Sequence, residues 1–289
     1  MIIDSHHHLW QYSAEDYGWI GDDMSSLRRD FLLDELRDVA ADHGVDRFVT
    51  VQARQSLEET RWLLGLSDQE PRIGAVVGWA PLAEANVSDV LDRLSEHPRL
   101  RGIRHVVQDE PDDRFLLDEA FNRGVEALTA RRLVYDILIY ARQLPAAIEF
   151  VDRHPEQTFV LDHVAKPTIR ESAFDETWER GFRELARREN LWCKVSGMVT
   201  EVRDPAWREE TLRRYWQVAL EAFSPRRLMF GSDWPVCLCK AGYGDWLGTV
   251  RRWAEDLSDH ERTELFSRNA VRVYGIDPLP DEATAGSPT

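Results

Sequence analysis

The sequence predicts an α/β protein built as a single (β/α)8 barrel, and three observations support this. Eight short runs rich in valine, isoleucine and phenylalanine recur along the 289 residues. Most of these runs lack strict alternation of apolar and polar residues, which is typical of strands buried on both faces. Segments with helical spacing of apolar residues lie between most of them. An open doubly wound sheet is the alternative, but no Gly-x-Gly-x-x-Gly motif follows a predicted strand.

The strands are predicted from runs of β-branched and aromatic residues. In chain order they are Ile2–His8, Arg47–Gln52, Ile73–Trp79, Gly102–Val106, Val134–Ile139, Phe159–His163, Trp192–Ser196 and Leu228–Gly231.

The helices are predicted from apolar residues three and four positions apart. Phe31–His43 carries Leu33 and Leu36 at this spacing, and Gly44 follows it as a typical helix stop. No helix is predicted between the second and third strands. The other predicted helices are Ser88–His97, Leu117–Arg131, Leu144–His154, Phe174–Arg188, Trp207–Phe223 and Trp246–Leu257.

Composition and charge narrow the class of protein. A net charge of −16 and a pI near 5.0 argue against nucleic acid and anionic membranes as partners. No apolar run reaches about 18 residues, no secretory leader is recognised, and three cysteines are too few for a disulfide framework. We therefore expect a cytoplasmic enzyme with one domain over residues 1–276 and a disordered tail over residues 277–289. The oligomeric state is not indicated.

The first predicted strand carries the most informative residues. Side chains two positions apart on a strand point to the same face, so Asp4, His6 and His8 should share one face while His7 points away. Two adjacent imidazoles at a strand end can bind one divalent metal or one polarised oxygen.

Further polar residues stand at the C-terminal ends of the other strands, where barrel enzymes have their active sites. A barrel core alone does not require them. They are Gln52, Trp79, Arg104, His105, Asp136, Tyr140, Asp162, His163, Lys166, Lys194, Ser196, Ser232, Asp233 and Trp234.

These residue types allow two kinds of site. His6, His8, His163 and Asp233 could surround one metal, and their nitrogen and oxygen ligands suit Zn²⁺ or Mn²⁺. Asp233 could then deprotonate a water molecule. Without metal, the histidines could polarise the carbonyl of a reactive substrate such as a lactone, and Asp233 would still be the base. Candidate substrate contacts are Arg104, His105, Lys166, Lys194, Trp234 and Tyr140.

Five motifs occur in an order and spacing that resemble the amidohydrolase superfamily (amidohydrolase-2 type), in its branch of sugar-lactone hydrolases with the L-fuconolactone and L-rhamnonolactone hydrolases. The resemblance covers nearly the whole chain to about Tyr274. The motifs are Asp4-Ser5-His6-His7-His8, Gly102-Ile103-Arg104-His105, Leu161-Asp162-His163-Val164-Ala165-Lys166-Pro167, Cys193-Lys194-Val195-Ser196-Gly197 and Gly231-Ser232-Asp233-Trp234-Pro235.

The resemblance implies a distorted (β/α)8 barrel that opens a sugar-acid lactone with water, with L-fucono-1,5-lactone as the first candidate. It implies that His6, His8 and His163 face the metal or the carbonyl, and that Asp233 activates water. Many relatives bridge two metals with a residue of a middle strand. This sequence has no clear counterpart of that residue, and Asp136 is only the nearest candidate. The expected metal content is therefore one zinc or manganese ion or none.

Two alternatives to a lactone hydrolase remain open from the sequence. One is a metal-dependent decarboxylase of the same superfamily, which would need an aromatic pocket and a tightly held zinc. The other is a non-catalytic barrel that binds sugar acids, which would not need a base beside three imidazoles.

Overall fold

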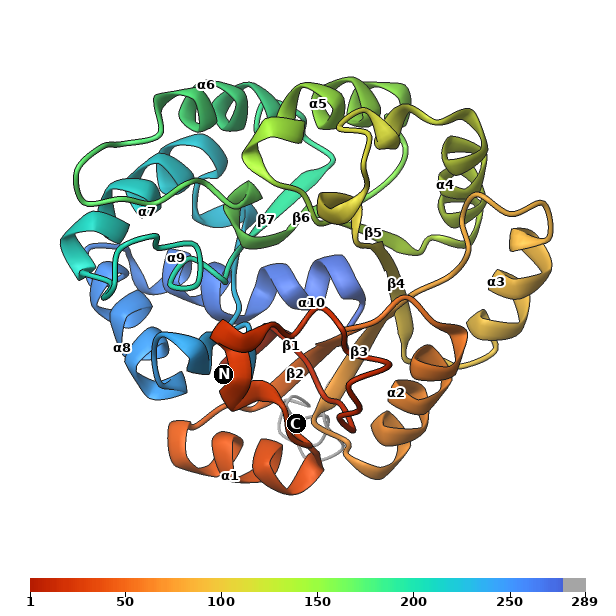
Figure 1. Ribbon diagram of the computed structural model, residues 1–289, viewed down its shortest axis with the longest axis horizontal. Coiled ribbons are helices and arrows are strands. Elements are labelled where there is room, and N and C mark those ends of the chain that lie inside the picture. The colour runs from red at the N-terminus through yellow and green to blue at the C-terminus, as the bar shows by residue number, and fades with distance from the viewer. Residues whose placement is uncertain (278–289) are drawn as a thin grey trace, which may run out of the picture.

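The computed structural model describes residues 1–277, and in this range eight parallel strands form one sheet in which each strand neighbours the next in chain order (Figure 1). The strands are β1 Ile3–His7, β2 Arg47–Val51, β3 Ile73–Gly78, β4 Leu100–His105, β5 Val134–Ile137, β6 Phe159–Leu161, β7 Leu191–Val195 and β8 Leu228–Phe230. The predicted (β/α)8 barrel is therefore confirmed. Apart from Asp277, the predicted tail lies outside the described residues.

Helices surround the sheet on its outer side, as Figure 1 shows. Their bounds are α1 Leu33–His43, α2 Leu57–Gln69, α3 Val87–Ser95, α4 Glu119–Arg131, α5 Leu144–Arg153, α6 Glu176–Leu185, α7 Glu209–Phe223, α8 Tyr243–Trp253, α9 Asp259–Thr263 and α10 Asn269–Tyr274.

Helix α2 was not predicted, although a local signal for it exists. Gly65 lies inside the segment and weakens the helical pattern. Ser56 and Glu59 nevertheless form the Ser-x-x-Glu pair typical of a helix start. In the structure the Ser56 hydroxyl accepts the backbone N–H of Glu59 at 3.0 Å. None of the helices in the described part of the chain has both the length and the apolar character needed to cross a membrane.

The barrel closes between β8 and β1 through contacts made just beyond β8. The backbone N–H of Asp233 donates to the carbonyl of His6 at 2.8 Å, and that of His8 donates to the carbonyl of Trp234 at 2.7 Å. A single parallel bridge joins His7 to Trp234. This closure brings the end of the last strand beside the two predicted site histidines.

Asp4 does not share the face of His6 and His8, which corrects the prediction from strict alternation. The pairing of β1 with β2 is irregular between Asp4 and His7, so the two-residue period is lost there. The Asp4 carboxylate instead accepts the Ser232 backbone N–H at 2.8 Å and the Tyr243 hydroxyl at 3.0 Å. Asp4 thus ties β1 to the segment after β8 and to α8.

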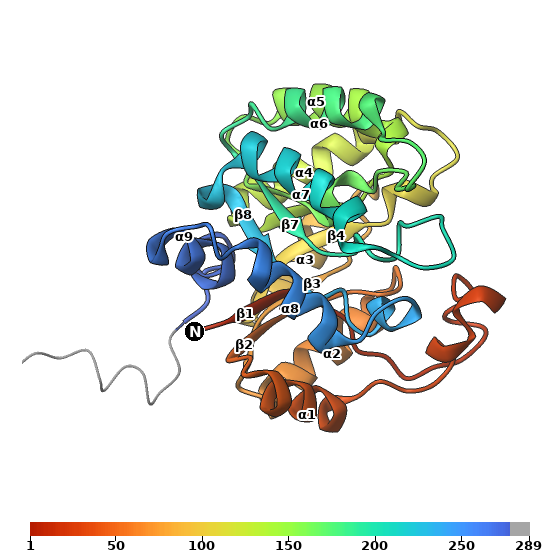
Figure 2. The ribbon, with the colours of Figure 1, turned by 90° about the vertical axis from the view of Figure 1, so that its left-hand side faces the viewer.

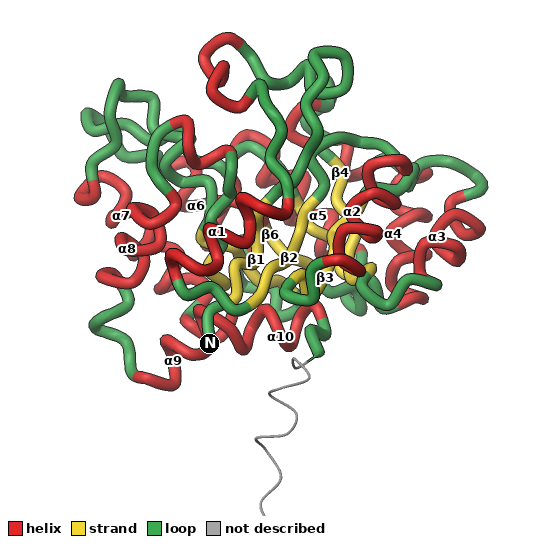
Figure 3. Tube along the Cα trace, turned by 90° about the horizontal axis from the view of Figure 1, so that it is seen from below, coloured by secondary structure: helices red, strands yellow, loops and turns green. Residues whose placement is uncertain are grey.

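Different segments lie at the two ends of the barrel. At the N-terminal ends of the strands, α10 lies across the barrel (Figure 3), and its Tyr274 hydroxyl donates to the Asp136 carboxylate at 2.9 Å. Neither α9 nor α10 was predicted. At the opposite end, the segments after β1 and after β7 both extend away from the barrel, as Figure 2 shows.

Candidate active site

A cavity of about 740 Å³ opens at the C-terminal ends of the strands. Its wall includes residues from β4, from the segments after β1, β5 and β8, and from the turn after β6. Six residues predicted from the sequence contribute to this wall: His8, Arg104, Tyr140, His163, Lys166 and Asp233.

Three imidazoles converge on one carboxylate at the base of this cavity. Asp233 Oδ1 lies 3.4 Å from His8 Nε2, 3.8 Å from His6 Nε2 and 3.9 Å from His163 Nε2. All four side chains are at least 95% buried. The four residues to which the sequence assigned catalysis and metal binding therefore form one cluster.

The hydrogen bonds of His8 show that this cluster fits a cation. A backbone carbonyl can only accept, so the 2.8 Å contact between His8 Nδ1 and the Val51 carbonyl places the proton on Nδ1. In an imidazole with its proton on Nδ1, the Nε2 atom carries the lone pair, and in His8 this atom faces His6 Nε2, 3.2 Å away, and the Asp233 carboxylate. Ligand atoms of His6, His8 and Asp233 lie within 4.8 Å of one another. Electron-pair donors that converge in this way, with the other ring nitrogen held by a carbonyl, are typical of metal ligands.

Below His6 lies a buried network of charged groups. His6 Nδ1 is 3.3 Å from Asp162 Oδ1, and the Lys194 ammonium is 3.1 Å from the same oxygen. Lys194 also contacts Asp136 Oδ2 at 2.5 Å and has no exposed surface. The predicted contact of Lys194 with substrate is therefore corrected. Lys194 is the penultimate residue of β7 and does not line the cavity; its ammonium pairs with the two carboxylates under His6.

Burial and these charges together set the protonation states of the network. Burial lowers the pKa of His6 well below its ordinary value, although Asp162 opposes this effect. Burial alone would raise the pKa of Asp162, but the Lys194 ammonium and the His6 imidazole hold it well below its ordinary value. His6 is thus kept neutral, with an ionised carboxylate at Nδ1.

His163 reaches the cluster from an unusual turn after β6. Four consecutive residues, His163, Val164, Ala165 and Lys166, have φ between 45° and 59°, in the left-handed region that costs an ordinary residue about 1–2 kcal/mol. The Trp178 indole N–H holds this turn by donating to the Val164 carbonyl at 2.7 Å. Such strain persists where the surroundings enforce it, often at functional sites. Here the turn presents both His163 and Lys166 to the cavity.

The ring of His163 is fixed by the segment that follows β7. Its Nδ1 is 2.9 Å from the Ser196 hydroxyl. A β-carbon on Gly197, which has φ of 63°, would lie 2.5 Å from that same Nδ1 atom. Glycine is therefore required at this position, and the ring can turn only its Nε2 toward Asp233.

Burial lowers the pKa of His163 to about 4, although Asp233 and Asp162 oppose the shift. Burial alone would raise the pKa of Asp233, but the neighbouring His163 and His8 imidazoles and the Lys166 ammonium outweigh it and lower that pKa. Near neutral pH the cluster therefore holds an ionised carboxylate beside a neutral His163.

Two other predicted substrate contacts point away from the cavity and are corrected. His105 follows Arg104 on β4 and so points outward, where it pairs with Glu110 at 2.6 Å and stacks on Phe115. Trp234 is 97% buried, packs edge-to-face against Phe31 and does not line the cavity.

The cavity wall also contains charged residues that the sequence reasoning missed. Arg54, after β2, forms an ion pair with Asp16 from the long segment after β1. Glu201 and Arg203, from the segment after β7, form a second pair at 2.9 Å. All four lie in loops, where no strand periodicity indicates the direction of a side chain. In the sequence, these residues could have been noticed only as charged residues in the loops that follow the strands.

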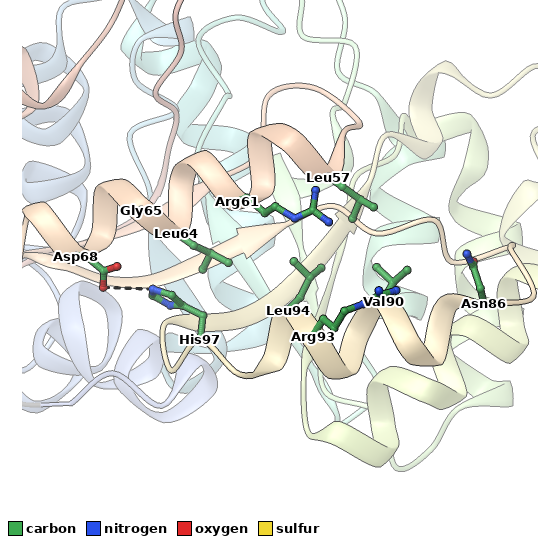
Figure 4. Close-up of a pocket in the computed structure, with 10 residues that line it drawn as sticks. All are labelled: Leu57, Arg61, Leu64, Gly65, Asp68, Asn86, Val90, Arg93, Leu94 and His97. Carbon is green, nitrogen blue, oxygen red and sulfur yellow. Dashed lines mark ion pairs between the residues drawn. The ribbon is translucent and has the colours of Figure 1, made fainter.

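A second groove lies outside the barrel, between α2 and α3 (Figure 4). Leu64 and Leu94 form its floor, and His97 pairs with Asp68 at 3.2 Å. None of the predicted site residues lines it. Among the described residues, the groups able to hold a metal are His6, His8 and Asp233 and, sharing His6, the group of His6, Asp162 and His163.

Comparisons with known proteins find a matching family and similar chains. The amidohydrolase family profile matches residues 3–276. An L-fucono-1,5-lactonase of Burkholderia multivorans is 44% identical, with 97% of this chain and 98% of that protein covered. An L-fucono-1,5-lactonase of Burkholderia ambifaria is 35% identical, with 95% and 96% covered. A crystal structure of an amidohydrolase from Burkholderia multivorans with bound zinc has a TM-score of 0.91 and 43% identity, with 96% of this chain and all of that chain covered.

Proposed function

The chain belongs to the amidohydrolase family, and we propose that it hydrolyses a sugar-acid lactone to the free aldonic acid, with L-fucono-1,5-lactone as the first candidate substrate. The observation that carries this proposal is the convergence of His6, His8 and His163 on the Asp233 carboxylate in a cavity with a polar wall. The two relatives named as L-fucono-1,5-lactonases support the substrate class.

Asp233 is the base in the proposed reaction. Its carboxylate accepts a proton from water as the water oxygen bonds to the lactone carbonyl carbon. The bond from that carbon to the ring oxygen then breaks, and the proton passes from Asp233 to the ring oxygen as it leaves. The lowered pKa of Asp233 keeps the base ionised at neutral pH. A positioned base of this kind typically contributes about 10²–10⁴-fold in rate.

His6, His8 and Asp233 are the residues that would hold one divalent ion, and zinc is the preferred candidate because a similar amidohydrolase contains it. When bound, zinc supplies Lewis acidity that polarises a carbonyl oxygen. Asp162 and Lys194 orient His6 from below, and Ser196 orients His163. Such supporting contacts typically change metal affinity or activity about 10–100-fold when removed.

Arg104, Tyr140 and Lys166 are the proposed substrate contacts. All three lie in the cavity wall and present donors suited to a lactone oxygen and then to the product carboxylate. Arg104 is fixed by Asp162 at 2.9 Å, so its guanidinium needs little ordering when substrate binds. The Trp19 ring, which is 37% exposed and also borders the cavity, can stack on the apolar face of a sugar ring.

The cavity favours a sugar lactone over the aromatic acid that a decarboxylase would require. Two ion pairs contribute to its wall, one of Arg54 with Asp16 and one of Glu201 with Arg203. Its described aromatic residues are Trp19 and Tyr140. A polar wall of this kind matches hydroxyl groups better than a benzene ring. A barrel that only binds sugar acids has no use for a base beside three imidazoles.

The free thiols of Cys193, Cys237 and Cys239 agree with the proposed cytoplasmic location. The acidic surface likewise agrees with a small-molecule substrate rather than nucleic acid as the partner.

Acid release from a panel of lactones, followed with a pH indicator, tests the proposal. The panel should contain several aldonolactones, long-chain acyl homoserine lactones and a phosphotriester, with spontaneous hydrolysis subtracted. We expect the highest kcat/KM on an aldonolactone. Higher kcat/KM on acyl lactones or phosphotriesters than on every sugar lactone would overturn the substrate class. Release of CO₂ from aromatic acids without lactone hydrolysis would favour the decarboxylase.

A further inference from the structure

Glu201 is a buried carboxylate in the cavity wall that the proposed chemistry does not use. Its side chain is only 7% exposed, although it lies in the segment after β7 rather than in the barrel core. Two cations flank it, with Lys166 Nζ at 3.5 Å from Oε1 and Arg203 Nη2 at 2.9 Å from Oε2. These contacts offset the free-energy cost of burying the ionised Glu201 carboxylate, but they do not explain why a carboxylate lies in the cavity wall.

The backbone around Glu201 holds the carboxylate in a fixed position. Its carbonyl accepts the Ile169 N–H at 3.4 Å, and the Ile169 carbonyl accepts the Arg203 N–H at 2.9 Å. A parallel bridge pairs Ile169 with Val202. The Glu201 N–H donates to the Met198 carbonyl at 3.3 Å. Glu201 is therefore supported from both sides, and its position does not depend on a mobile loop end.

The carboxylate also has unused hydrogen-bonding capacity. A carboxylate has about four lone-pair sites, and the two cations account for one contact at each oxygen. The remaining sites can accept only from donors such as hydroxyl groups. Glu201 and Lys166 border the same cavity as His163 and Asp233, and Lys166 belongs to the left-handed turn that begins at His163. A ring whose carbonyl lies at the imidazole cluster can thus extend toward Glu201.

We propose that Glu201, held between Lys166 and Arg203, accepts hydrogen bonds from the ring hydroxyls of the substrate and selects polyhydroxylated lactones over unsubstituted ones. This inference rests on the proposed lactone hydrolysis for its substrate class. Glu201 is a specificity residue for the part of the ring that does not react.

The test compares Glu201→Gln with wild-type protein on two lactones of equal ring size. L-fucono-1,5-lactone carries ring hydroxyls, whereas δ-valerolactone has none. The variant should lose at least about tenfold in kcat/KM on the sugar lactone, since hydrogen bonds to charged groups are the stronger ones. On δ-valerolactone it should stay within about twofold. Glu171→Gln is the matched control, because Glu171 is exposed, pairs with Arg208 and does not line the cavity. It should leave both values unchanged.

A binding measurement keeps the inference testable apart from catalysis. The 1,5-anhydroalditol with the hydroxyl pattern of L-fuconolactone has no carbonyl, so its dissociation constant reports hydroxyl recognition alone. Calorimetry should show at least tenfold weaker binding to Glu201→Gln than to wild-type protein. Equal loss of kcat/KM on both lactones, or equal affinity of the two proteins for the anhydroalditol, would overturn the inference. If wild-type protein hydrolyses no lactone but binds the anhydroalditol through Glu201, the proposed hydrolysis fails while the hydroxyl site stands.

Discussion

Replacing Asp233 by asparagine should remove the base while the fold persists. Asparagine is nearly the same size as aspartate but cannot accept a proton at neutral pH. Asp233 has φ of 60°, and asparagine tolerates the left-handed region better than most residues. The backbone hydrogen bonds of Asp233, from its N–H to the His6 carbonyl and from the Cys237 N–H to its own carbonyl, do not involve the side chain. Asp233→Ala would add backbone strain and is the less informative change.

The magnitude follows from the role of the carboxylate. Loss of a positioned base typically costs about 10²–10⁴-fold, which corresponds to about 3–5 kcal/mol of activation free energy. The substrate contacts of Arg104, Tyr140 and Lys166 are untouched, so the loss should fall on kcat and leave KM within about threefold. Stopped assays of aldonolactone hydrolysis at pH 7, with thermal unfolding of each protein recorded in parallel, measure both effects. Zinc content is determined on the same samples, because Asp233 is also a candidate ligand.

Asp113→Asn is the matched control for this experiment. Asp113 follows β4, is half exposed and pairs with Arg142 at 2.7 Å without lining the cavity. It should keep full activity. A folded Asp233→Asn protein with kcat within about threefold of wild type, at any zinc content, would refute the assignment of Asp233 as the base.

Three further outcomes are expected. Ser196→Ala, which removes the 2.9 Å contact to His163 Nδ1, should lower kcat/KM about 10–100-fold with little change in unfolding temperature, and unchanged kinetics would show that the ring needs no such support. Burial raises the pKa of Glu59 to about 7 from an ordinary value of 4.5, so the stability it contributes is present below pH 4.5 and is lost as the pH rises through 7. Between pH 5 and pH 8 the free energy of urea unfolding should therefore fall by roughly 2.5 kcal/mol more in wild-type protein than in Glu59→Gln, and equal decreases in both proteins would contradict this. Elemental analysis should find at most about one zinc per chain, and chelation should reduce activity only in part, because a lactone is already an activated ester. Two tightly held ions per chain would contradict the expectation of a single metal site.

Local sequence patterns predicted the barrel because each strand and most helices carry their own signal. Apolar runs marked all eight strands, and the polar residues at their C-terminal ends marked the open face. His6 and His8 were predicted to share a face because they are two residues apart on a strand. The segment from Leu57 to Gln69 was missed because Gly65 weakens its helical pattern.

The sequence could not decide which polar residues turn toward the cavity. Arg104 and His105 are neighbours on a strand covered on both faces, so either could have pointed inward, and only the register of β4 in the barrel selects Arg104. Lys194 was correctly placed on β7, but its depth relative to His6 depends on the stagger of neighbouring strands.

The sequence by itself determined the order of the elements, the pair of histidines on β1 and the carboxylate after β8. Only the tertiary structure decided that His163 meets them, because its approach depends on a left-handed turn held by Trp178 and on the absence of a side chain at Gly197. It likewise decided that Glu201 enters the cavity wall. Such contacts join residues far apart in the chain. The local conformational preferences of those residues either disfavour the final geometry or do not indicate it. Packing of the whole barrel supplies the free energy that enforces it.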